Sequence, residues 1–127
     1  MPSVLLDTNI LIDHLRGKPA STRLLKLLNE KETRLLCSVV TRIELLAGIR
    51  AGEEDSINSL LKIFHEVAVD TAIADSAGKY LNLYMKSHGL MPVDAILAAT
   101  AKKNNVPVYT LNIKHFPMDD IDVEAPY

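Results

Sequence analysis

The chain has 127 residues, of which 48% are hydrophobic, 24% charged and 5% aromatic, and its formal net charge is −2. This composition excludes a disordered chain, and the length is typical of one domain with a substantial core. The small acidic balance lacks the basic excess that usually marks nucleic-acid-binding proteins. Residues 1–127 are therefore expected to form a single domain that meets any polyanionic partner through a local patch.

Apolar segments with strand character recur along the chain. Residues 3–6 form an unbroken apolar run and are expected to be a strand that is buried on both faces. Further strands are predicted at 35–37, 66–69, 106–111 and, as a weak strand in the tail, 121–123.

Helical spacing occupies the segments between these strands. A short helix begins after Asp7 and ends near Gly17, and Ser21 or Thr22 is expected to cap the next helix. Ser38 is expected to cap a third helix, and the remaining helices are predicted at 53–64, 71–88 and 93–103. Strands that alternate with helices predict an α/β fold with a parallel sheet and helices on both faces.

The chain shows no sign of a membrane or secretory protein. No apolar run reaches the length of a membrane span, and the N-terminus lacks a signal-peptide pattern. The single cysteine, Cys37, lies in an apolar run and is expected to be a buried small hydrophobe that suits a reducing compartment. These features predict a cytoplasmic protein.

Four polar residues are predicted to meet at the carboxyl ends of the strands, where open parallel sheets bind ligands. Asp7 directly follows the first strand, and Asn112 follows the fourth. Glu44 interrupts apolar neighbours in the helix after the second strand, and Asp94 lies in the first turn of an Ala-rich helix.

Each of these residues also has a purely structural interpretation. Asp7 can cap the following helix, and Asp94 can stabilise the positive end of its own helix. Asn112 can form an Asx turn, and Glu44 can point into solvent. Several carboxylates buried together, however, need a neutralising partner. Oxygen ligands without a His or Cys set favour Mg²⁺ or Mn²⁺ over zinc, and such a metal assists phosphoryl chemistry.

Four motifs in this sequence resemble those of a known family. They are LLDTNILI at 5–12, TRIELLAG at 41–48, PVDAILAA at 92–99 and TLNIKHF at 110–116. In order and spacing they resemble the successive motifs of PIN-domain ribonucleases, and most of all the VapC toxins of toxin–antitoxin pairs. The resemblance covers nearly the whole chain. It implies a three-layer α/β/α fold with a central, mainly parallel sheet of four to five strands.

The resemblance also implies an activity, that of a Mg²⁺- or Mn²⁺-dependent endoribonuclease. Asp7, Glu44 and Asp94 match the three metal-binding acids of the family. Asn112 matches a fourth catalytic position that carries Asp in many members and Asn in others. Only three carboxylates therefore remain, and substrate phosphate is expected to complete any second metal site. The implied reaction is in-line attack of a metal-activated water on a phosphodiester, which leaves a 3′-hydroxyl and a 5′-phosphate.

Other residues near the motifs are candidates for supporting roles. The resemblance implies that Thr8, Asn9 and Thr110 line the pocket or lie beside the metal and its waters, although Thr110 also suits a plain strand position. His115 is expected to contact substrate or support the metal ligands. The candidates for contacts with RNA phosphates, each of which can equally be a solvated surface charge, are Arg42, Lys114, Arg16, Lys18 and Arg50.

Two protein partners follow from the same resemblance, a cognate VapB-type antitoxin that covers the acids and a second copy in a homodimer. Six apolar side chains are candidates either for a partner groove or for the core, namely Leu24, Leu27, Leu28, Ile57, Leu60 and Leu61. Two other functions stay open. One is a PIN-fold binding module with weak catalysis, and the other is a receiver-like phosphate-signalling domain, which the solitary acid after the first strand disfavours.

Overall fold

The computed structural model describes residues 2–127, and within them five strands form one sheet. The strand order is β3-β2-β1-β4-β5, and every neighbouring pair is parallel. The strands are β1 (Ser3–Leu6), β2 (Arg34–Ser38), β3 (His65–Val67), β4 (Val108–Tyr109) and β5 (Val123–Glu124). The predicted parallel sheet is confirmed, and its five strands are the higher number of the expected range of four to five.

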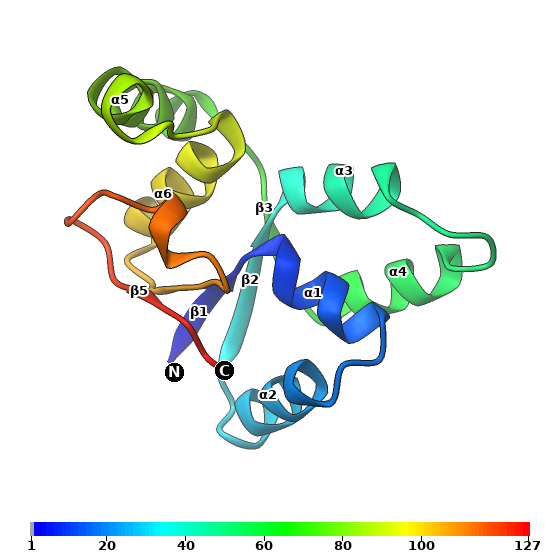
Figure 1. Ribbon diagram of the computed structural model, residues 1–127. Helices are drawn as coiled ribbons and strands as arrows, with labels where there is room; N and C mark the ends of the chain where they lie inside the picture. The colour runs from blue at the N-terminus through cyan, green and yellow to red at the C-terminus, as the bar shows by residue number, and fades with distance from the viewer. Residues whose placement is uncertain (1) are drawn as a thin grey trace.

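Two layers of helices cover the sheet, so the predicted three-layer α/β/α arrangement is confirmed (Figure 1). One side carries α1 (Thr8–Leu15), α2 (Pro19–Glu30), α3 (Val39–Ala47) and α4 (Glu54–Lys62). The other side carries α5 (Thr71–His88) and α6 (Pro92–Asn104). A short 3-10 helix follows β4 at Ile113–His115. Within residues 2–127, no helix combines the length and apolarity needed to cross a membrane.

The unbroken apolar run of β1 reflects burial on both faces of the sheet. Val4 and Leu6 pack into the core under α1 to α4, whereas Leu5 between them packs into the core under α5 and α6. Successive strand residues point to opposite faces, so both faces require apolar side chains here. Cys37 of β2 is buried in the first of these cores, as predicted.

The candidate groove residues belong mostly to the core. Five of the six are buried in the cluster under α1 to α4, and these are Leu24, Leu28, Ile57, Leu60 and Leu61. Leu27 alone of the six is exposed. The partner-groove interpretation is therefore wrong for the five buried residues.

The predicted cap of α3 is confirmed, and the predicted cap of α2 is wrong. The Ser38 hydroxyl accepts a hydrogen bond from the backbone N–H of Val40. The second helix begins earlier than expected, at Pro19, because proline is well suited to the first helical position. Ser21 therefore lies inside α2, where its buried hydroxyl donates to the carbonyl of Ile10 at 2.7 Å and ties α2 to α1.

The fourth strand is shorter than the predicted segment 106–111. The Val106 N–H donates to the Ala101 carbonyl at the end of α6, so it is not available to the sheet, and Pro107 has no N–H to donate. Beyond β4, the chain turns away after Thr110. The third strand and the tail strand are also shifted from their predicted bounds by one to two residues, since strand ends depend on partners that the local pattern does not contain.

The topology brings three chain segments to one edge of the sheet. β1 and β4 are neighbours, and the Asp7 N–H donates to the Tyr109 carbonyl at 2.9 Å. On the other flank of β1, β2 leads directly into α3 at Ser38. The residues that follow β1, β2 and β4 therefore converge at the carboxyl ends of the central strands.

Candidate active site

A cavity of about 350 Å³ opens at this edge of the sheet. All four predicted catalytic residues line it, although they come from four different segments of the chain: Asp7, Glu44, Asp94 and Asn112. Thr8, Asn9 and His115 also line the cavity. Thr110 does not, because it is completely buried next to Asp7. The sequence-predicted cluster is thus brought together by the fold.

Asp7 joins β1 to α1 and is only 8% exposed. It occupies the N-cap position of α1, but its side chain makes no capping hydrogen bond, so the simple cap interpretation is wrong. Its Oδ2 accepts a hydrogen bond of 2.8 Å from the Thr110 hydroxyl. Burial raises the pKa of Asp7, the Thr110 bond and the Thr8 backbone oppose this rise, and the charge of Glu44 adds to it.

Glu44 points inward from α3, so the solvent-facing alternative is wrong. The Thr8 hydroxyl donates to its Oε1 at 2.6 Å, and the same hydroxyl lies 2.9 Å from that of Thr41. At Glu44 the usual orientation of polar and apolar side chains on a surface helix is inverted. Ile43 is 64% exposed, whereas the Glu44 carboxylate is partly buried. An acid that faces inward beside an apolar residue that faces outward is the opposite of a stable surface helix. This inversion favours a functional role for both faces of α3.

Asp94 is the third residue of α6, at the positive end of the helix. Its Oδ2 lies 3.6 Å from Nδ1 of His115. Burial raises the pKa of Asp94 to about 6, and the charges of Asp7 and Glu44 contribute to the rise while His115 opposes it. The helix-end interpretation is compatible with this position, but it does not account for the proximity of two other carboxylates.

Asn112 stands at the mouth of the cavity and is exposed. Its backbone N–H donates to the Thr110 hydroxyl oxygen at 3.0 Å, and the Asn9 side-chain amide contacts the same oxygen at 3.4 Å. Thr110 is therefore more than a strand residue, because its hydroxyl links Asp7 to both asparagines. Within residues 2–127, the Asn9 Oδ1 atom is the buried side-chain oxygen or nitrogen that has no hydrogen-bond partner.

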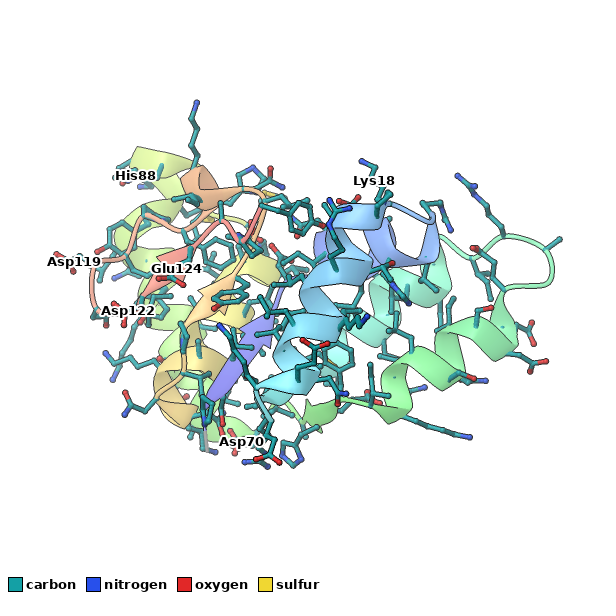
Figure 2. The ribbon with its side chains drawn as sticks, turned by 90° about the horizontal axis from the view of Figure 1, so that it is seen from below. Lys18, Asp70, His88, Asp119, Asp122 and Glu124 are labelled. Carbon is teal, nitrogen blue, oxygen red and sulfur yellow. The ribbon has the colours of Figure 1, made fainter. Side chains whose placement is uncertain are left out.

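Three of the five candidate RNA-contact residues are already paired with carboxylates. Both Nε and a terminal nitrogen of Arg42 donate to Glu66. Arg16 contacts Glu53 at 2.5 Å. Lys18 lies 3.4 Å from Asp13. In Figure 2, Lys18 stands apart from the labelled tail residues Asp119, Asp122 and Glu124, which lie on the left of the view. Lys114 and Arg50 are exposed, and Lys114 lies between two residues of the cavity.

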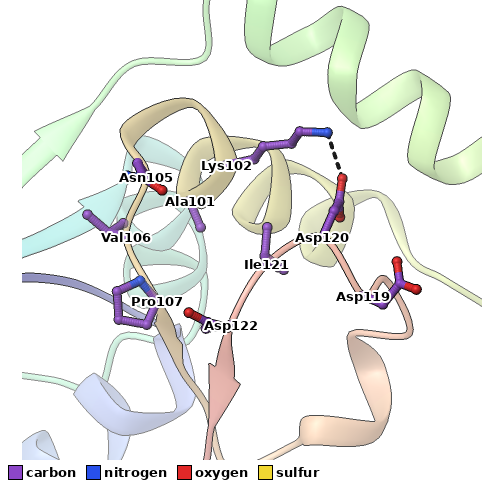
Figure 3. A pocket seen from close by; sticks show the side chains of 9 residues that line it. All are labelled: Ala101, Lys102, Asn105, Val106, Pro107, Asp119, Asp120, Ile121 and Asp122. Atoms are coloured by element: carbon purple, nitrogen blue, oxygen red, sulfur yellow. Dashed lines mark hydrogen bonds and ion pairs between the residues drawn. The ribbon is translucent and has the colours of Figure 1, made fainter.

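A second cavity, of about 450 Å³, lies at the opposite edge of the sheet between the end of α6 and the tail (Figure 3). Aspartates 119, 120 and 122 line it together with Lys102. Asp120 forms an ion pair with Lys102 at 2.6 Å and accepts a hydrogen bond from the Tyr80 hydroxyl at 2.8 Å. The first cavity, in contrast, gathers carboxylates that lack a comparable lysine or arginine partner among residues 2–127.

The first cavity fits a hard divalent cation. The charge of Glu44 raises the pKa of Asp7, the charges of Asp7 and Glu44 raise the pKa of Asp94, and oxygen ligands suit Mg²⁺ or Mn²⁺. The Thr110 and Thr8 bonds engage one oxygen of Asp7 and one of Glu44, and the unpartnered Asn9 Oδ1 adds a further acceptor. In the part of the chain that the structure describes, no three His, Cys, Asp or Glu side chains already stand at ligand spacing. A bound cation would offset the repulsion between these carboxylates.

The PIN domain model matches residues 4–119. The chain belongs to the PIN domain family. This PIN domain protein is 37% identical to Ribonuclease VapC19 of Mycobacterium tuberculosis over 97% of its own length and 98% of the relative. It is similar to VapBC-1 from nontypeable Haemophilus influenzae, with a TM-score of 0.77, 26% identity and 98% coverage of both chains. The DNA-bound VapBC of Salmonella typhimurium shares the fold, with a TM-score of 0.82, 23% identity and full coverage of both chains.

Thr41, which lies next to the cavity of this PIN domain protein, is not among the residues predicted from the sequence. It lies three positions before Glu44 on α3, is completely buried, and pairs with Thr8. Residues three apart on a helix share a face. A threonine on the same face as an inward-pointing glutamate was therefore the available signal.

Proposed function

We propose that this PIN domain protein is a Mg²⁺- or Mn²⁺-dependent endoribonuclease and the toxin of a VapBC-type toxin–antitoxin pair. The observation that carries the proposal is the convergence of Asp7, Glu44 and Asp94 at one cavity, with raised pKa values for two of the three. The similarity to Ribonuclease VapC19 supports the choice of RNA as substrate. Residues 1–127 act together in this proposal as one nuclease domain.

The three acids share one task in the proposed site, and two hydroxyls orient two of them. Asp7, Glu44 and Asp94 would hold the cation. When bound, Mg²⁺ or Mn²⁺ supplies Lewis-acid polarisation of the phosphate and a coordinated water of lowered pKa. The Thr110 hydroxyl orients Asp7, and the Thr8 hydroxyl orients Glu44. Water adds across the P–O3′ bond, so that the products carry a 3′-hydroxyl and a 5′-phosphate.

Asn112 and His115 are assigned to the substrate side of the cavity. Asn112 is exposed at the mouth, where its amide can donate to a phosphate oxygen. His115 is 56% exposed in its side chain and lies beside Asp94, so it is placed to contact the RNA and to restrain that carboxylate. With an amide at the fourth position, we propose one resident metal, and a second only when substrate phosphate completes its ligands.

RNA is proposed to approach along the exposed basic side chains at the rim. Lys114 is the first choice because it directly precedes His115 and lies two positions after Asn112. Arg50 is exposed on the loop after α3 and is the second choice. Arg42, Arg16 and Lys18 would have to leave their carboxylate partners before contacting phosphate, so we assign them a smaller role.

The proposed protein partners are a VapB-type antitoxin and a second copy of the chain. The similarity to the H. influenzae VapBC-1 structure supports the antitoxin. We assign it to the exposed apolar side chains of Ile43 and Leu46, because they lie on the same helix as Glu44. For the homodimer, Leu83 and Met85 leave apolar surface exposed on α5. Sedimentation analysis of the purified chain tests the dimer, and we propose that the protein acts in the cytoplasm.

Cleavage of a structured RNA in the presence of Mg²⁺ tests the nuclease proposal. Cleavage is expected to stop with EDTA and to fall at least about 100-fold in Asp7→Asn and Asp94→Asn proteins, because each change removes a metal-binding charge. Asp75→Asn, an exposed acid on α5, is the matched control and is expected to cleave normally. Mapping of RNA ends identifies the cut site and the 5′-phosphate.

The same assay decides between catalysis and the binding-module alternative. Wild-type protein that binds RNA without cleaving it would support the module, and activity that persists in Asp94→Asn protein would place the site elsewhere. The receiver-like alternative is wrong, because the chain belongs to the PIN domain family. Growth arrest on expression, relieved by a co-expressed small partner protein, tests the toxin role separately.

A further inference from the structure

Thr41 is a buried threonine that contacts the site without lining the cavity. It is the third residue of α3, and its side chain is 0% exposed. Because it precedes Glu44 by three positions, the two side chains lie on the same face of the helix. Its hydroxyl lies 2.9 Å from the hydroxyl of Thr8, which belongs to α1. This contact therefore joins α1 to α3, the helix that carries Glu44.

Which of the two hydroxyls donates at this contact follows from the number of hydrogen atoms available. A threonine hydroxyl has one hydrogen to donate and can accept from other donors. The hydrogen of Thr8 is used by Oε1 of Glu44, at 2.6 Å. At the 2.9 Å contact, Thr41 must consequently be the donor and Thr8 the acceptor. The result is a series of two hydrogen bonds, in which Thr41 donates to Thr8 and Thr8 donates to the Glu44 carboxylate.

The hydroxyl of Thr100, another completely buried threonine in a helix, has a different kind of acceptor. Thr100, in the middle of α6, donates to the carbonyl of Ile96 in its own helix at 2.7 Å. This is the usual solution for a buried threonine in a helix. For Thr41 the residue four positions earlier is Cys37, which belongs to β2 rather than to α3. Its hydroxyl is instead satisfied across the helix–helix contact.

We propose that Thr41 is a positioning residue for the metal site, a role that rests on the proposed function. By donating to Thr8, it holds the Thr8 hydroxyl in the one rotamer that directs its hydrogen at Glu44. Hydrogen bonds in such chains strengthen one another in a low-dielectric interior. Groups that orient the ligands of a metal affect affinity and activity, typically by about 10- to 100-fold. Thr41 would thus orient the Glu44 carboxylate through the Thr8 hydroxyl, without contacting the metal.

The test compares three variants of the full chain. Thr41→Val keeps the shape and removes the hydroxyl, Thr41→Ser keeps the hydroxyl, and Thr100→Val removes an equally buried hydroxyl away from the cavity. Mn²⁺ binding is measured by calorimetry, and RNA cleavage and thermal unfolding are measured alongside. We expect Thr41→Val to weaken Mn²⁺ binding by about 10-fold, and Thr41→Ser to stay within about twofold of wild type. Thr100→Val should lose thermal stability only.

A double-mutant cycle tests whether Thr41 acts through Thr8. In a Thr8→Val background, the Thr41→Val change should have no further effect on Mn²⁺ affinity, because the hydrogen bonds from Thr41 through Thr8 to Glu44 are already lost. Equal and independent effects in the two backgrounds would overturn the proposal. So would a Thr41→Val protein that loses as much thermal stability as Thr100→Val but binds Mn²⁺ like the wild type.

Two provisions keep the outcomes distinct. If Thr41→Val does not fold, Thr41→Cys replaces it, because a thiol is a weak donor of similar size. The Ser variant must then bind Mn²⁺ more tightly than the Cys variant, and equal affinities would overturn the role of the hydroxyl. If the wild type binds Mn²⁺ but cleaves no RNA, the nuclease proposal fails, and the Mn²⁺ affinities of the variants still decide the role of Thr41.

Discussion

The hydroxyl of Thr110 donates a hydrogen bond of 2.8 Å to Oδ2 of Asp7, across 103 positions of the sequence. The bond is possible because β4 lies beside β1 in the sheet, so the first and last motifs share one edge. It gives the buried Asp7 carboxylate a donor that does not neutralise it. The carboxylate is held in place without an ion-pair partner, which is the state that the proposed metal site requires.

Removal of the Thr110 hydroxyl is expected to impair the site more than the fold. Thr110→Val keeps the shape of this completely buried side chain but leaves Asp7 without its donor. We expect cleavage and Mn²⁺ affinity to fall by about 10-fold each. Thr110→Ser should stay close to the wild type. Equal losses in the Ser and Val variants, measured in the same assays, would show that packing of the methyl group matters and the hydroxyl does not.

Neutralising Asp94 is expected to stabilise the metal-free protein. The pKa of Asp94 rises from 3.8 to about 6 on folding, so the folded state favours the protonated form. The stability from this group is fully present below pH 3.8 and is lost as the pH rises through about 6. In EDTA at pH 7.5, Asp94→Asn should therefore gain stability, by at most about 3 kcal/mol.

Urea unfolding in EDTA measures the Asp94 effect, and its dependence on pH is the informative part. The gain of Asp94→Asn over the wild type should shrink between pH 7.5 and pH 4.5, because the wild-type carboxyl becomes protonated over this interval. The exposed Asp75→Asn change serves as the control and should show no such trend. Added Mg²⁺ should stabilise the wild type more than Asp94→Asn. A gain that is absent at pH 7.5 would contradict the electrostatic account.

Lys114 and Arg42 are expected to differ in their importance for RNA binding. Lys114 is exposed beside the cavity, whereas the Arg42 guanidinium is held by the two hydrogen bonds that it donates to Glu66. Lys114→Ala should raise KM by about threefold and lower the slope of affinity against salt concentration by about one. Arg42→Ala should leave KM within about twofold. Cleavage assays at several salt concentrations, with Lys26→Ala on α2 as the control, measure both effects. A larger KM effect from Arg42 than from Lys114 would contradict this order.

Tyr127 is expected to stabilise the fold through Asp13. Its hydroxyl donates to Oδ2 of Asp13 at 2.8 Å, and burial together with this bond raises the pKa of Tyr127 to about 12. Tyr127→Phe should lower the free energy of unfolding by about 1–2 kcal/mol, because a nearly buried carboxylate loses its donor. In an Asp13→Asn background the same change should cost less. Urea unfolding of the four proteins measures this, and an undiminished cost in the Asn background would exclude the pair.

The local pattern of the sequence determined the helices and the order of the elements. The helix expected at 71–88 has those bounds, because Asp70 caps its start through the Ile73 N–H at 2.9 Å and Gly89 ends it with a φ of 65°. These signals act within one turn of the chain. The motifs likewise identified Asp7 and Asp94 as candidates, since their positions relative to a strand end and a helix start are local.

Only the tertiary structure decided how those residues are held. The Thr8 hydroxyl contacts Thr41 and Glu44, which are 33 and 36 positions away, and no local pattern specifies such a pair. The pairing of Arg42 with Glu66 is also a product of packing, between α3 and β3. Side-chain hydrogen bonds depend on which helices and strands become neighbours. Sequence patterning therefore located the acids, and the packing of α1 against α3 and of β1 against β4 supplied the hydroxyls that orient them.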